Sequence, residues 1–228
     1  IHCVRLSDGK TTTIDTKMWI MMLHFGNAYQ ADDNTIVLEG PAYTKSDGDP
    51  YTIYMHDYLT SIEGITSHNL GNVYTKFTLH LDTMTMERED LLSSEYGSYD
   101  LPQYNHKLEG VGKNRYTFLF HQFWQTTIDE TYHWPVVKYD HESKKIVAEY
   151  GPDLTVTQEP RFIYKPDGAE DEGYILFHQY DIKNEKSSIV VLDAMNFKKV
   201  QEYILPFKLS IQFHNNYFRY SEFVSKQD

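Results

Sequence analysis

The chain has 228 residues, enough for one sizeable core or two small ones, and a formal net charge of −12 with a pI of about 5.3. An acidic chain repels the phosphate backbone, which argues against a nucleic-acid partner. The single cysteine, Cys3, excludes disulfides within the chain and zinc sites built from thiolates, which leaves imidazole and carboxylate to hold a transition metal. No apolar run reaches the roughly 18 residues of a membrane-spanning helix, and we expect a cytoplasmic or peripheral membrane location.

Aromatic residues make up 15% of the chain, which favours β structure because these side chains suit half-buried pleated surfaces. One pattern recurs in which an apolar run, an Asp and a few polar residues precede a second alternating run. It predicts β-hairpins with Asp at the turn, where the carboxylate accepts from a backbone amide two residues on. The four copies are Cys3–Ile14, Phe77–Met86, Val136–Val147 and Ile189–Val200, with Asp8, Asp82, Asp140 and Asp193 at the turns.

Hairpins at roughly 50- to 75-residue intervals leave room for two more strands each, which fits four-stranded propeller blades. A β-sandwich also contains hairpins, but its strands recur at shorter intervals. Between the hairpins we expect a short helix at Tyr58–Thr66, a loop at Glu87–Asn105 and a charged turn at Pro166–Gly173 before the strand Tyr174–Gln179. The chain opens at Ile1 without methionine, and we interpret it as part of a longer protein.

The sequence contains 11 histidines, and two of them lie in distinctive surroundings. His24 belongs to LHFGNAYQ, shortly before the strand-like run Thr35–Leu38, and His214 belongs to SIQFHNNYF near the end of the chain. No HExxH motif, GxSxG elbow, P-loop or GxGxxG is present. Histidine is the commonest metal ligand and the usual acid–base residue near neutral pH, but a surface or core histidine is the ordinary interpretation of any one of them.

Six segments in order resemble the carotenoid cleavage oxygenases, the retinal pigment epithelial membrane protein-like family. LHFGNAYQ resembles the family's F-H-x-x-N-A-Y-E, and SIQFHNNYF resembles its C-terminal F-H-G-x-[WF]. Between them, YDLPQYN, QEPRFIY, DGAEDEGYIL and VVLDAMNFKKVQEYIL are similar to further family segments in the same order. The resemblance implies an all-β fold that is part of a seven-bladed β-propeller. About four blades fall in this chain, residues 1–228 are its C-terminal portion, and the N-terminal blades are missing.

The resemblance also implies a site, because four histidines hold Fe(2+) on the propeller axis of these proteins. His24 falls on the third of these positions and His214 on the fourth, while Asp100 and Glu159 fall on positions whose carboxylates orient the ligands by accepting the other ring N–H. Asp100 replaces the usual Glu and is shorter by one methylene, so we expect backbone adjustment or a bridging water. Two further departures are Gln30 for Glu and Asn215 for Gly, the latter mild if that position has positive φ.

The implied activity is non-haem Fe(II)-dependent dioxygenase cleavage of a conjugated C=C bond of a carotenoid or apocarotenoid with O2, giving two carbonyl products. The expected partners are O2 and a hydrophobic polyene or stilbenoid substrate, with peripheral membrane contact. His56, which lies in MHDY, and His121 and His178, which lie in FHQF and FHQY, mimic ligand motifs at the wrong places. Because two ligands are half a site, we expect the chain alone to be an inefficient enzyme. The alternatives are an inactive propeller fragment that binds proteins and an unrelated kelch-like propeller.

Overall fold

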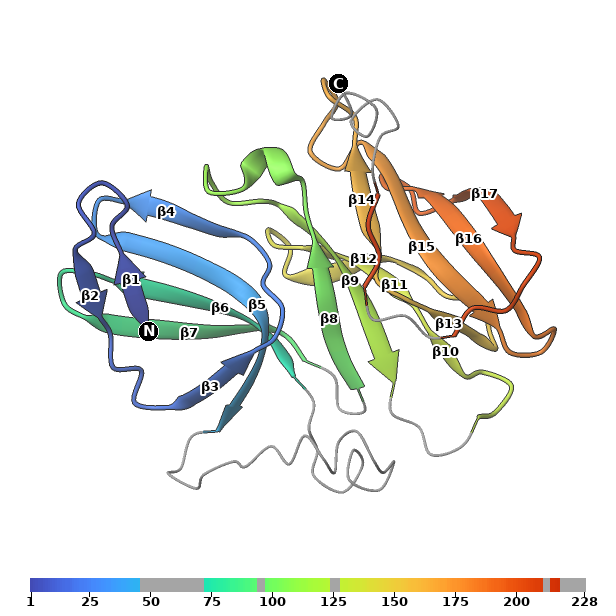
Figure 1. Cartoon of the computed structure of the whole chain (residues 1–228), viewed down its shortest axis with the longest axis horizontal. Coiled ribbons are helices and arrows are strands. Elements are labelled where there is room, and N and C mark those ends of the chain that lie inside the picture. The colour runs from blue at the N-terminus through green and yellow to red at the C-terminus, as the bar shows by residue number, and fades with distance from the viewer. Residues whose placement is uncertain (46–71, 94–96, 124–127, 211–213, 218–228) are drawn as a thin grey trace, which may run out of the picture.

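The computed structural model describes residues 1–45, 72–93, 97–123, 128–210 and 214–217. Seventeen strands and one 3-10 turn, η1 (His106–Leu108), make up their regular structure. Three sheets lie side by side in chain order (Figure 1), and a separate two-stranded hairpin of β1 (His2–Val4) and β2 (Thr11–Thr13) precedes them. In these ranges no helix is long and apolar enough to cross a membrane. The expected all-β class is confirmed, and the described residues form three sheets and one hairpin.

The first sheet contains five strands, and its long strand β5 is flanked on one side by two short ones. β3 pairs with the end of β5, from Ala42 to Lys45, and β4 pairs with its beginning, from Thr35 to Leu38. The chain between β3 and β4 therefore interrupts what would otherwise be one continuous edge strand, and His24 lies in that interruption. The strands are β3 (Trp19–Met22), β4 (Ala28–Asp32), β5 (Thr35–Lys45), β6 (Val73–His80) and β7 (Thr85–Leu92).

The second sheet has the order β12-β11-β9-β8, and its edge strand β8 is irregular. The register of β8 against β9 shifts between Asp100 and Gln103, and Leu101 has a φ of +53°. Pro102 has no N–H to donate to the ladder, which accounts for a bulge at this place. The strands are β8 (Gly97–Gln103), β9 (Tyr116–Phe123), β11 (Val136–Asp140) and β12 (Lys145–Tyr150).

The third sheet repeats the interruption seen in the first. β13 pairs with β15 at Gln179–Asp181 and β14 pairs with it at Gly173–Leu176, so residues 158–160 lie between two short strands beside one long strand. Pro160 lacks the donor that a continuous ladder would need. The strands are β10 (His133–Trp134), β13 (Thr155–Thr157), β14 (Arg161–Tyr164), β15 (Gly173–Asp181), β16 (Lys186–Asp193) and β17 (Lys199–Ile204).

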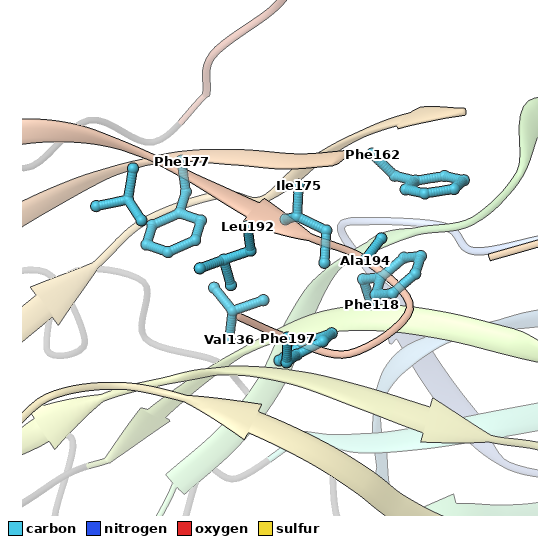
Figure 2. Packing of buried hydrophobic residues seen from close by; sticks show 9 residues of the cluster. Phe118, Val136, Phe162, Ile175, Phe177, Leu192, Ala194 and Phe197 are labelled. Carbon is cyan, nitrogen blue, oxygen red and sulfur yellow. The ribbon is translucent and has the colours of Figure 1, made fainter. Parts of the chain in front are cut away.

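Two apolar cores join the three sheets. Phe118 and Val136 of the second sheet pack against the third sheet, where Ile175 and Phe177 lie opposite them (Figure 2). Their sequence neighbours Leu119 and Val137 lie in the other core, with Tyr74 of the first sheet. Successive side chains of a strand point to opposite faces, so the second sheet buries both of its faces.

All four predicted Asp hairpins are present. The hairpins are β1–β2, β6–β7, β11–β12 and β16–β17. Asp8, Asp140 and Asp193 each accept from the amide two residues on, at 2.9–3.0 Å, whereas Asp82 accepts from the next residue, Thr83. The turn chemistry therefore follows from the local sequence.

The predicted loop at residues 87–105 is wrong, because most of it forms β7 and β8. The acidic residues of β7 misled the prediction, since they lie on the outer strand of the sheet, where charged side chains are tolerated. The predicted helix at 58–66 and the MHDY segment with His56 lie outside the described residues.

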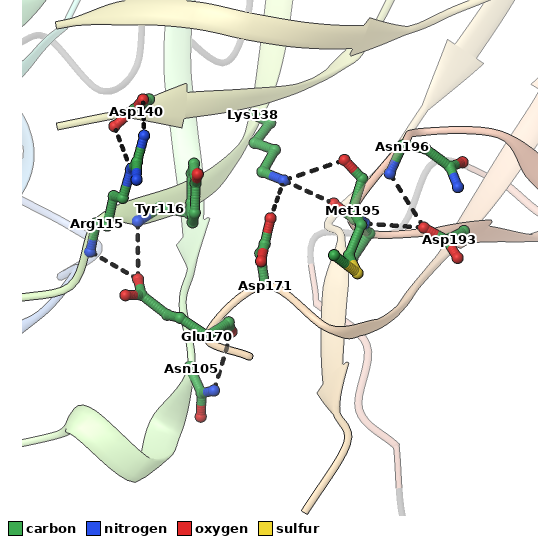
Figure 3. A network of polar contacts seen from close by, with 11 residues as sticks. Asn105, Arg115, Tyr116, Lys138, Asp140, Glu170, Asp171, Asp193, Met195 and Asn196 are labelled. Atoms are coloured by element: carbon green, nitrogen blue, oxygen red, sulfur yellow. Dashed lines mark hydrogen bonds and ion pairs between the residues drawn. The ribbon is translucent and has the colours of Figure 1, made fainter. Parts of the chain in front are cut away.

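The predicted charged turn after Pro166 is confirmed, and it ties the third sheet to the second (Figure 3). The Glu170 carboxylate accepts from the backbone N–H groups of Arg115 and Tyr116, at 2.6 and 2.9 Å. The buried Lys138 ammonium donates to Asp171 at 2.6 Å. These charge-assisted contacts hold the loop between β14 and β15 against the middle sheet.

Candidate metal centre

His24 lies where the edge of the first sheet is interrupted, and two glycines allow the chain to pass closely there. A Cβ at Gly40 would lie 2.9 Å from the His24 carbonyl oxygen, and one at Gly26 would lie 2.5 Å from the Tyr74 hydroxyl. The Gly26 N–H donates to the Glu39 carbonyl at 2.8 Å, which keeps the interrupted segment against β5. The glycines thus let the ligand-motif segment pack tightly beside its neighbouring strand.

Asp100 contacts His24 directly. The His24 Nδ1 and the Asp100 Oδ1 are 2.8 Å apart, and the Leu101 N–H donates to the same oxygen at 2.7 Å. The Asn72 amide donates to the other carboxylate oxygen at 3.3 Å. The shorter Asp side chain therefore reaches the imidazole through the bulge of β8 and the positive φ of Leu101. Whether this geometry is an adjustment to the shorter side chain stays a prediction.

The Asp100 carboxylate also affects the pKa of His24 and which ring nitrogen carries the proton. Hydrogen bonding to Asp100 raises the pKa of His24, against the opposing effect of burial. With Nδ1–H donated to Asp100, a neutral His24 keeps its Nε2 lone pair free, which is the arrangement that orients metal-binding histidines.

Glu159 and His214 form the corresponding pair on the third sheet, with a looser contact. Glu159 lies between β13 and β14 and is 4% exposed. The His214 Nδ1 lies 3.5 Å from the Glu159 Oε2, which is long for a hydrogen bond. The same oxygen accepts from the Asn215 N–H at 2.7 Å. Asn215 does not have positive φ, so its backbone needs no left-handed conformation at this position.

The two imidazoles approach each other across the ends of the first and third sheets. Their ring centroids are 5.1 Å apart and their planes are inclined by 75°. A ligating nitrogen about 2.1 Å from a metal puts its ring centroid roughly 3.2 Å away, so two rings at about 90–110° would be separated by roughly 4.5–5.3 Å. The observed spacing suits two neighbouring ligands of one ion. Within the described ranges, no group of three or more His, Cys, Asp or Glu residues could hold a metal.

A chain of buried polar groups lies directly behind the His24 segment. Asn27 is fully buried, and its side-chain amide donates to the Gly112 carbonyl at 2.7 Å and to the Asn114 side chain at 3.1 Å. Since Asn27 belongs to the first sheet and Asn114 precedes β9, these bonds cross between two sheets. They give Asn27, a member of the motif that first singled out His24, a physical role in fixing that motif.

The buried chain continues to a pair of titratable groups that we did not predict. The Asn114 amide donates to the Thr117 hydroxyl at 2.8 Å, which in turn lies 2.8 Å from the His141 Nε2. The same nitrogen is 3.6 Å from the Glu39 Oε2. Burial raises the pKa of Glu39 to about 7 and lowers the pKa of His141 to about 4. No local sequence signal links residues 39 and 141, because only the packing of two sheets brings them together.

Two of the other histidines that resembled ligand motifs, His121 and His178, lie on strands of the second and third sheets. His121 lies on β9, stacked on Tyr99 with ring centroids 4.0 Å apart. His178 lies on β15 and is 5% exposed. That these two histidines are not metal ligands stays a prediction. Gln30, the replacement for a family Glu, is exposed on β4.

Comparison with solved structures places the fold among propeller oxygenases. The cobalt-substituted apocarotenoid oxygenase of Synechocystis superimposes with a TM-score of 0.69 at 21% identity, over 93% of this chain and 42% of that one. The lignostilbene dioxygenase of Pseudomonas brassicacearum gives a TM-score of 0.70 at 19% identity, over 91% and 43%. The chain thus spans less than half the length of these structures. These likenesses confirm the expected β-propeller fold, of which this chain forms a part.

The sequence comparisons identify the family. The family described as retinal pigment epithelial membrane protein matches residues 4–219. The resveratrol cleavage oxygenase 1 of Chaetomium globosum is 38% identical over 69 residues, which are 29% of this chain and 11% of that protein. This chain belongs to the retinal pigment epithelial membrane protein family, the carotenoid cleavage oxygenases that its motifs resemble.

Proposed function

We propose that this chain is part of a non-haem Fe(II) oxygenase that cleaves a conjugated C=C bond with O2 to give two carbonyl products. His24 and His214 would supply two of the imidazole ligands. The observation that carries the proposal is the 5.1 Å approach of these rings, each with a carboxylate near its Nδ1. Ferrous iron, when bound, supplies the activation of O2 that protein side chains lack.

The contribution of the chain itself is orientation. Asp100 accepts the His24 Nδ1 proton and so leaves Nε2 to face the metal position, and Glu159 has the same place relative to His214. Two neutral imidazoles bind Fe(II) weakly, so the proposal requires further ligands from outside the described residues. The chain on its own is then a weak binder of iron without turnover.

The proposed substrate is an apolar conjugated molecule, either a polyene or a stilbenoid. Membership of the family supports a carotenoid or apocarotenoid, and the names of the resveratrol and lignostilbene relatives support a stilbenoid. Peripheral membrane contact stays a prediction.

The alternative of an inactive propeller module rested on the replacements at Asp100 and Gln30. The 2.8 Å contact between Asp100 and His24 supports a retained orienting role. No observation on the described residues favours the alternative over the oxygenase.

Titration of the anaerobic chain with Co(II), followed by visible absorption and calorimetry, tests the ligand assignment. We expect weak binding that His24→Ala and His214→Ala each reduce about tenfold or more. His80→Ala is the matched control, since His80 lies on β6 of the first sheet and should leave the affinity unchanged. Equal binding by the wild type and both ligand variants would contradict the assignment. If the chain alone binds stoichiometric iron and turns over substrate, the proposal that it supplies only part of the metal site is wrong.

A further inference from the structure

Among the described residues, the last strand along the chain is β17, which ends at Ile204. His214 itself lies in coil, with 58% of its side chain exposed. Its 3.5 Å contact with Glu159 is too long to fix a ring by itself. The position of this imidazole therefore depends on how its neighbours are attached to the third sheet.

Asn215 provides the first attachment. Its backbone N–H donates to the Glu159 carboxylate at 2.7 Å, and its side-chain amide donates to the Glu159 backbone carbonyl, also at 2.7 Å. That carbonyl is available because Pro160 interrupts the strand at this point. The second bond needs an amide side chain, which Gly, the usual family residue at this position, does not have.

Arg161 provides the second attachment. It lies two residues after Glu159, and its Nη2 is 3.1 Å from the Glu159 Oε1. Its Nε donates to the Asn215 carbonyl oxygen at 2.7 Å, and Nη2 donates to the same oxygen. The planar guanidinium thus bridges the carboxylate and the coil segment, which a lysine ammonium would not reproduce in the same geometry.

We propose that Arg161 and Asn215 are positioning residues that fix the His214 imidazole opposite His24. Together their side chains and the Asn215 N–H contact both carboxylate oxygens of Glu159, the Glu159 carbonyl and the Asn215 carbonyl. These contacts fix Asn215, and because Asn215 directly follows His214, they also restrict His214. This inference rests on the proposed function for its expected effect on metal affinity. The contacts themselves are observed in this structure.

The first test is a nuclear Overhauser effect between the His24 and His214 ring protons in the metal-free chain. We expect it in the wild type and its loss in Arg161→Met and in the Arg161→Met/Asn215→Gly double variant. Asn215→Gly alone should weaken it, and this milder variant keeps the test open if Arg161→Met does not fold. Arg88→Met is the matched control, because Arg88 pairs with Asp90 at 2.7 Å on β7, far from the third sheet in the chain.

The second test is Co(II) affinity of the same full-length variants. We expect Arg161→Met to weaken binding about 10- to 100-fold, as for other residues that orient metal ligands, and Arg161→Lys to restore only part of it. An unchanged Overhauser effect in the double variant would contradict the positioning role of Arg161 and Asn215, whatever the Co(II) affinity. Co(II) binding that is unchanged in His24→Ala and His214→Ala would contradict the proposed function. The first test would then still decide the positioning role.

Discussion

At the scale of single residues, the four site positions differ in how firmly they are held. His24 contacts Asp100 at 2.8 Å, and that carboxylate is in turn held by Leu101 and Asn72. His214 has no such short contact with Glu159 and depends on Asn215 and Arg161. His214 is therefore the proposed ligand whose geometry is more open to disturbance.

The buried Glu39 makes stability depend on pH. Its folded pKa of about 7 lies above the ordinary 4.5, so the unfolded state loses its proton first, and the free energy of unfolding falls as pH rises from 4.5 to 7. Glu39→Gln removes this loss. The unfolding free energy of the variant minus that of the wild type should increase by on the order of 3 kcal/mol between pH 4 and pH 8 in urea titrations.

His141→Asn is the matched control with the opposite sign. The folded pKa of His141 is about 4, below its ordinary 6.5, so wild-type stability is lost as pH falls through that window. The advantage of the variant should therefore grow on acidification. A pH-independent difference for Glu39→Gln would show that Glu39 is not the buried group that titrates.

At the scale of elements, the loop between β14 and β15 is held by a buried lysine (Figure 3). The Lys138 Nζ donates to Asp171 at 2.6 Å and to the carbonyls of Ala194 and Met195 at 3.0 and 3.3 Å, and it lies 4.3 Å from the Tyr116 ring centroid. Lys138→Met leaves these acceptors without their donor, and we expect a loss of about 2–4 kcal/mol in the free energy of unfolding.

Denaturant unfolding of Lys138→Met and Lys144→Met measures this effect. Lys144 pairs with Glu89 but is 64% exposed, so its removal should cost less than about 1 kcal/mol. Adding Asp171→Asn to Lys138→Met should recover part of the loss, because it removes the unpaired charge. Equal effects of the two lysine variants would refute the role of Lys138.

At the scale of the whole molecule, the second sheet contributes residues to both of the apolar cores that join it to its neighbours. Phe118 packs toward the third sheet and Leu119 toward the first. Phe118→Ala and Leu119→Ala should each lower the free energy of unfolding by about 2–5 kcal/mol, since each leaves a cavity in a core. Each variant should still unfold in one transition, because losing either core exposes a face of the shared sheet.

Calorimetry and hydrogen exchange check this prediction. Val147→Ala, at a 49% exposed position of β12, is the control and should change stability little. Two separate transitions in either core variant would show that the sheets unfold independently.

Several features of the fold could be predicted from short stretches of the sequence. The four Asp hairpins were predictable because an Asx turn depends on residues next to each other, and Pro102 and Pro160 mark two strand interruptions through their missing donors. Strand β7 was missed because an outer strand tolerates charge on its solvent side, which resembles a loop in sequence.

The family, and with it the choice of His24, Asp100, Glu159 and His214, followed from six ordered motifs. Their roles at iron stay predictions, to be tested as above.

The tertiary structure alone decided the contacts among these residues. The bulge that lets Asp100 reach His24, the guanidinium bridge of Arg161 and the Glu39–His141 pair each join positions from different strands or sheets. The sequence motifs identify the candidate residues. The distances of 2.8–3.6 Å between side chains far apart in the chain depend instead on how the sheets pack and where their edges are interrupted. That packing is a property of the whole fold, because each sheet buries its faces only against its neighbours.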